Sequence, residues 1–300
     1  MIEDLIKTAM TGDPGGARDT ARTLADPALL REFSALFGRK LMAIERKLAY
    51  EFLDYLARNS RSPEVAAFLL ERLGAEKSEA TQLEILGALR LLDGLEPHPI
   101  EPMLVSAKPR VRLAAIQALG ACAGERPVQL LTDILCRSAG GEEARVCAEA
   151  LARCGNEATA DAMIDALDGL ERTRQNMTAI LSLLVAVSAL CGPRHRAWLR
   201  DQLSLRTDPI ERWLVLLGLT RIGTSADCAL VAAEVEAYLE KPTGPINLMT
   251  GHTPIAHRTL FQAGMSFLHR TCPEQFARLA TRAQSAKLPA EDRDHIDRLT

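Results

Sequence analysis

The sequence of 300 residues predicts an all-α fold made of repeated pairs of helices. A short apolar helix pattern that ends in glycine recurs along the chain at a nearly constant interval. Proline stands at several positions where a helix can begin, because its missing N–H is not needed in the first turn. No run of alternating β-branched and polar residues is long enough for a strand. We therefore expect about eighteen helices and no sheet.

The repeat is clearest at the glycines that end its apolar helices. These are Gly94, Gly124, Gly155, Gly192 and Gly223, and successive members are 30, 31, 37 and 31 residues apart. A period near 30 accommodates two helices of about twelve residues and two turns. One such hairpin cannot bury its apolar face alone, so neighbouring hairpins are expected to stack into a curved solenoid with a continuous core.

One expected helix start carries residues that cap free backbone amides. Asp208 is predicted to accept hydrogen bonds from the first turn of its helix, and Glu211 is predicted to reach back as in a capping box. Proline at the first helical position predicts helix starts at Asp26-Pro27, Ser62-Pro63, Asp208-Pro209 and Cys272-Pro273.

We expect residues 1–300 to form a single solenoid. Clear repeats cover residues 76–224, whereas residues 1–75 are divergent helices. Residues 225–300 are divergent repeats that contain a long loop at 241–255. The second helix of each hairpin is predicted over 47–58, 80–92, 110–122, 142–154, 174–190, 209–222 and 257–270.

One segment carries a family resemblance. Residues 108–120, KPRVRLAAIQALG, resemble the second helix of the short repeats found in phycobilin lyases, which belong to the HEAT-like repeat superfamily. The resemblance implies a right-handed α-α superhelix whose second helices line the concave surface. It says little about activity, because the superfamily contains scaffolds, adaptors, transport factors and a few enzymes.

Charge and hydropathy argue against several classes of protein. The formal net charge of −3 lacks the basic excess of a dedicated nucleic-acid binder. The longest apolar stretch, residues 177–191, is shorter than the ~20 residues needed to span a bilayer, so no membrane insertion is expected. Glu3 and Asp4 stand where a secretory signal would carry basic residues, which predicts a cytoplasmic protein.

The seven cysteines form no CxxC or CxxH pair, so we expect no disulfide framework. Cys122, Cys154 and Cys191 lie at or next to an apolar slot of the repeat and are predicted to be buried core residues.

The strongest candidates for a metal site are His252, His257, His269 and Cys272. Residues 256–270 are predicted to form one helix, which would separate His257 from His269 by about 18 Å. One ion cannot bridge that distance. A break in this helix at Gly264 is the alternative that would bring the ligands together. We predict no metal site and no cofactor.

The loop at 241–255 is the first candidate binding feature, because long connections in compact proteins are often functional. A tolerated insertion is the alternative. The polar contacts of this loop would come from Asn247, Thr250, His252 and Thr253.

The second candidate is a charge asymmetry. The predicted second helices carry twelve basic residues against seven acidic ones, although the whole chain is slightly acidic. The resemblance then implies a basic groove that would bind an acidic segment. Alternatively, Arg112 and Arg212 form ion ladders between repeats. The groove residues would be Arg112, Arg145, Arg174, Arg212 and Arg258.

These observations favour a non-enzymatic scaffold or adaptor that binds a protein or an acidic peptide on its concave face. One alternative is a protein similar to the phycobilin lyases, or chaperone-like, that acts on a cofactor-bearing partner. A DNA-repair protein similar to the HEAT-like glycosylases is less favoured, because each phosphate contact normally needs a cation.

Overall fold

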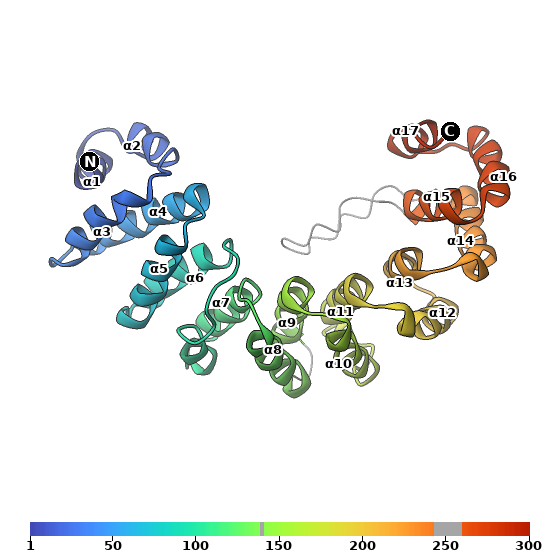
Figure 1. Cartoon of the computed structure of the whole chain (residues 1–300), viewed down its shortest axis with the longest axis horizontal. Helices are drawn as coiled ribbons and strands as arrows, with labels where there is room; N and C mark the ends of the chain where they lie inside the picture. The colour runs from blue at the N-terminus through green and yellow to red at the C-terminus, as the bar shows by residue number, and fades with distance from the viewer. Residues whose placement is uncertain (139–140, 243–259) are drawn as a thin grey trace. The chain divides into compact units, whose positions relative to one another are not determined.

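The computed structural model describes residues 1–138, 141–242 and 260–300. Within these ranges the chain forms 17 α-helices and no strand, which confirms the predicted all-α class (Figure 1). The nearest approach to a sheet is an isolated bridge between Leu95 and Cys122. None of the helices in the described ranges combines the length and the apolar character that a membrane span requires.

The chain divides into two compact units, Met1–Asp133 and Ile134–Thr300. Helix α8, Glu125–Arg137, runs across the boundary between them. The first unit also contains two short 3-10 helices, at Pro27–Leu29 and Glu101–Val105. Its α-helices are α1 (Ile2–Thr11), α2 (Pro14–Ala21), α3 (Leu30–Phe37), α4 (Ala43–Ser60), α5 (Pro63–Ala75), α6 (Glu79–Leu89) and α7 (Pro109–Leu119).

The second unit continues the helical pattern. Short 3-10 helices at Pro193–His195 and Ser225–Asp227 lead into two of its α-helices. The α-helices are α9 (Gly141–Cys154), α10 (Glu157–Asp168), α11 (Met177–Leu190), α12 (Arg196–Leu205), α13 (Pro209–Ile222), α14 (Cys228–Glu240), α15 (Leu260–Thr271), α16 (Pro273–Gln284) and α17 (Ala290–Asp297).

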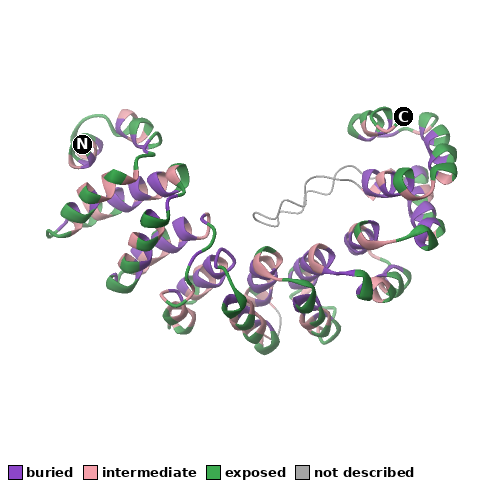
Figure 2. Cartoon of the chain, viewed as in Figure 1, coloured by how far each residue is buried: buried purple, intermediate pink, exposed green. Residues whose placement is uncertain are grey.

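The second helices of successive hairpins pack on one another. In the second unit α9 packs on α11, α11 on α13 and α13 on α15, while α10, α12 and α14 each pack on the helix that follows (Figure 1). In the first unit α4 packs on α6 and α6 on α7. We call these two sets the second-helix rows. Buried residues lie where neighbouring helices meet (Figure 2), and nine of the 14 residues of α11 are buried.

A helix begins at each of the four predicted prolines, and Asp208 caps its helix as predicted. Asp208 Oδ1 accepts from the amides of Ile210 (2.9 Å) and Glu211 (3.1 Å). Asp26 and Ser62 cap their helices in the same way. Cys272 makes no side-chain cap. The capping-box prediction for Glu211 is wrong, because its carboxylate is instead buried among arginines.

Close packing between α14 and α15 requires a glycine. A Cβ added at Gly264 would lie 2.5 Å from Cγ2 of Val235, and the β-branched valine is stiff about its first side-chain torsion. We expect Gly264→Ala to lower the free energy of unfolding by about 1–3 kcal/mol because the interface is overpacked.

Gly87 of α6 provides the matched control, because a Cβ there meets nothing within 4 Å. Gly87→Ala is expected to stabilise the chain by about 0.5–1 kcal/mol through helix propensity alone. Urea denaturation of both variants tests the packing, and equal effects of the two changes would contradict it.

Candidate functional site

Arg212 holds three helices of the second unit together. Its guanidinium pairs with Glu234 of α14. The Nη1 group also donates to the carbonyl oxygens of Leu203 (2.6 Å) and Arg206 (2.7 Å), at the end of α12. These contacts are those of an ion ladder, which is the alternative that the sequence left open for Arg212.

A second ion cluster surrounds Glu211, whose side chain is completely buried. Its carboxylate pairs with Arg172, which precedes α11, and with Arg206, which follows α12. The cluster therefore joins α13 to segments on both sides of it. A buried carboxylate requires such partners, because an isolated charge in the protein interior is costly.

Two further groove candidates are also engaged within the fold. Arg145 pairs with Glu142 and Glu149 of its own helix, at 2.5 Å in each case. The hydrogen bond to Glu142 is the main reason why the pKa of Arg145 is raised. Arg112 donates from Nη1 to the carbonyl oxygen of Ser106, at 2.9 Å.

Arg174 is exposed and lies in a turn rather than in the predicted helix, because α11 begins only at Met177. Arg110, in the first turn of α7, is likewise exposed. Neither arginine forms an ion pair within the described part of the chain. Several candidate residues lie outside the described residues, namely Arg258, Asn247, Thr250, His252 and Thr253.

Two of the four metal candidates lie in the described part of the chain, and each makes a contact within the fold. His269 packs edge-on against Phe276, with ring centroids 4.9 Å apart. Cys272 forms a disulfide with Cys228. His252 and His257 are outside the described residues, and the described ones contain no group of three metal-ligating side chains.

The Cys228–Cys272 disulfide was not expected from the sequence. Its Cα atoms are 6.4 Å apart, and it joins the start of α14 to the connection between α15 and α16. Cys122 and Cys191 are buried as predicted, whereas Cys154 is only partly buried. Burial nevertheless raises the pKa of Cys154 to about 11, so this thiol has little thiolate character at neutral pH.

Glu76 is the centre of an ion cluster in the first unit that sequence reasoning missed. Its Oε1 accepts from Arg46 (2.6 Å) and Arg72 (2.8 Å), and also from the hydroxyl of Tyr50 (2.8 Å). Burial opposes ionisation of Glu76, but the hydrogen bonds from Tyr50 and Arg72 outweigh it and lower its pKa. The guanidinium of Arg72 also lies 4.8 Å from the ring centre of Phe37. The cluster therefore joins α3, α4 and α5.

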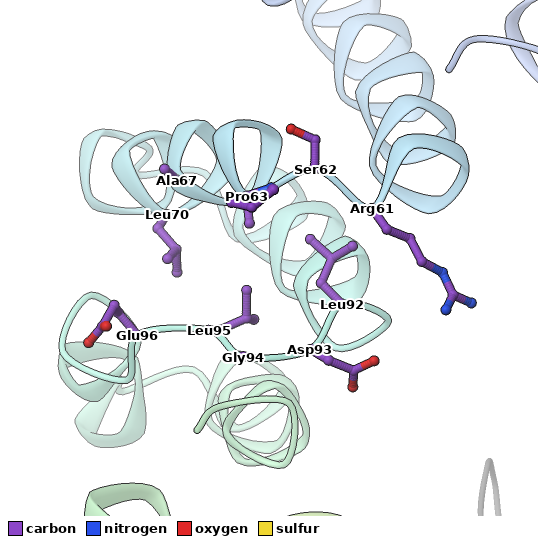
Figure 3. Close-up of a pocket in the computed structure, with 11 residues that line it drawn as sticks. Arg61, Ser62, Pro63, Ala67, Leu70, Leu92, Asp93, Gly94, Leu95 and Glu96 are labelled. Carbon is purple, nitrogen blue, oxygen red and sulfur yellow. The ribbon is translucent and has the colours of Figure 1, made fainter. Parts of the chain in front are cut away.

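A pocket of about 310 Å³ lies between the N-terminal half of α5 and the segment that follows α6 (Figure 3). We call it the α5 pocket. Arg61 and Glu96 are drawn at its opposite ends in Figure 3, and Asp93 is drawn near Arg61. The apolar part of the lining comes from Pro63, Ala66, Ala67, Leu70, Leu92 and Leu95.

Local hydrogen bonds hold both walls of this pocket. The amide of Leu95 donates to the carbonyl of Ala121 (3.2 Å), and its carbonyl accepts from the amide of Ala123 (3.1 Å). Gly94 turns the chain with a φ of 73°, a conformation that favours glycine. On the opposite wall, Ser62 caps α5. The pocket is thus built from residues with fixed backbone positions.

Comparison with protein-family models and with curated proteins finds no match. The crystal structure of an engineered protein aligns with 99% of this chain and 81% of its own length, at 16% sequence identity and a TM-score of 0.43. A likeness at this level carries no argument about fold or function.

Proposed function

We propose that this chain is a non-enzymatic, cytoplasmic scaffold or adaptor of the HEAT-like type, which binds a protein or an acidic peptide segment along its second helices. The observation that carries the proposal is the packing of α9, α11, α13 and α15 in one continuous row. Stacked helical hairpins create an extended surface suited to a long partner, because each repeat adds to it.

Some arginines are paired within the fold and others are exposed. This difference supports the proposal and restricts the candidate binding residues to the exposed ones. Arg145 and Arg212 are held by carboxylates of the fold, so they contribute to stability. Arg110 and Arg174 are exposed and form no ion pair in the described ranges. A guanidinium group can bind a carboxylate through two parallel hydrogen bonds, so these two side chains are suited to an acidic partner.

His195 is a buried histidine whose ring is engaged in contacts of the fold. His195 Nδ1 accepts from the amide of Gly192 at 3.0 Å, and Nε2 lies 2.8 Å from Oδ1 of Asp161. Both ring nitrogens are therefore occupied, and the imidazole is left without a nitrogen to serve as a base. His195 is therefore a structural residue in this chain.

Selection from a random peptide display library tests the proposed function. We expect the wild-type chain to enrich acidic peptides, and we expect their binding to weaken as salt is added, because exposed charges are screened. Peptides without acidic enrichment, or tighter binding of a DNA duplex than of any selected peptide, would contradict the proposal.

A further inference from the structure

We propose that the α5 pocket binds an extended peptide segment of a partner protein. The segment would carry an aliphatic residue in the centre, an acidic residue toward Arg61 and a basic residue toward Glu96. This inference goes beyond the proposed function, because the pocket is formed by α5 and the segment after α6 and does not include Arg110 or Arg174.

The apolar lining explains the central aliphatic residue. Leu70, Leu92 and Leu95 are buried, and the exposed side chain of Ala67 also lines the pocket. A volume of about 310 Å³ is at the lower end of the range for ligand sites in proteins. Full burial of one leucine side chain corresponds to about a 10- to 150-fold gain in affinity over glycine.

Charge complementarity explains the two flanking residues. Arg61 and Glu96 are exposed and are drawn at opposite ends of the pocket (Figure 3). Neither side chain has an ion pair or a hydrogen bond to any residue that the structure describes. By contrast, the arginines around Glu76 in the same unit are paired. A segment with an acid and a base on either side of its aliphatic residue would pair both of these free charges.

The backbone of Arg61 provides an independent reason to assign a role to its side chain. Arg61 has a φ of 46° and is the one non-glycine residue with positive φ in the described ranges. Glycine is favoured at such a C-cap, because the Cβ of other residues is crowded in this conformation. A strained residue at the edge of a pocket is typical of a functional position.

The same residue therefore allows binding and folding to be separated. We expect Arg61→Gly to raise the melting temperature, because it relieves the crowded conformation. The same change should weaken peptide binding about 5-fold, because the guanidinium is lost. A change that stabilises the fold and weakens binding cannot be explained by unfolding.

The probe is a blocked hexapeptide with one glutamate, one leucine and one lysine, titrated into the full chain and followed by amide NMR. Saturable changes in amide chemical shift are expected for residues 62–70 and 92–96. Replacing the peptide's leucine with glycine should abolish them, and Ala67→Phe, which fills the pocket, should do the same. Glu71→Gln, an exposed charge change on α5 that does not line the pocket, should have no effect.

A charge reversal gives the sharpest outcome. Arg61→Glu is expected to weaken binding of the mixed peptide and to strengthen binding of a peptide in which lysine replaces the glutamate. The proposal is overturned if the mixed peptide does not bind, if Ala67→Phe leaves binding unchanged, or if Arg61→Glu does not change the preference. Arg110→Glu should not affect binding of this peptide. A failure of the pocket proposal can therefore be distinguished from a failure of the proposed function.

Discussion

Replacing Glu76 with glutamine is expected to lower the free energy of unfolding by about 3 kcal/mol. The change leaves Arg46 and Arg72 without the carboxylate that both of them bind, and removal of one partner from a buried ion pair is strongly destabilising. The side chain of Glu76 is only 6% exposed, so water cannot replace the lost contacts. Urea denaturation measures the effect.

An exposed ion pair in the same unit is the matched control. Glu101 pairs with Arg126, whose side chain is 57% exposed, so Glu101→Gln should cost less than about 1 kcal/mol. Equal losses for the two variants would contradict the structural role of the Glu76 cluster.

The same cluster gives the stability of the chain a pH dependence. Because the folded-state pKa of Glu76 is lowered from its ordinary value of 4.5, the ionised carboxylate contributes stability above that pH. This contribution is lost as the pH falls through the folded-state pKa. Glu76→Gln should therefore lose less stability between pH 7 and pH 3 than the wild type does.

The disulfide between Cys228 and Cys272 is expected to have the other large effect. It closes a separation of 44 residues, for which the chain-entropy relation gives about 4 kcal/mol of stabilisation. Cys228→Ser/Cys272→Ser should lower the stability of the second unit by up to this amount, and a reductant should do the same to the wild type. Denaturation with and without reductant is the measurement.

Cys136 is exposed and free, and Cys136→Ser serves as the control that should leave stability unchanged. If the reductant and the double substitution both have no effect, the disulfide does not stabilise the second unit.

The helices were predictable because their signals are local. Pro63 and Pro209 begin helices at the expected positions, since proline suits the first turn. The start of α11 was predicted three residues too early. There the side-chain amide of Asn176 donates to the carbonyl of Glu171 (3.1 Å), and such local bonds compete with the helix.

The ion clusters and the pocket could not be predicted because they join residues that are distant in the sequence. Glu211 has the spacing of a capping box, yet it binds Arg172, which is 39 residues away. Cys228 and Cys272 lack any diagnostic spacing. Arg61 and Leu95 line the same pocket only when α5 and the segment after α6 fold together. In each case the interacting residues are brought together by tertiary contacts and not by their spacing in the sequence.

The most direct test of the proposed scaffold compares two double variants with an acidic peptide obtained by selection on the wild-type chain. We expect Arg110→Glu/Arg174→Glu to lose binding at an unchanged melting temperature, because both side chains are exposed and unpaired in the described ranges. Arg145→Glu/Arg212→Glu should lower the melting temperature, because it breaks internal ion pairs. Unchanged binding by Arg110→Glu/Arg174→Glu would contradict the account.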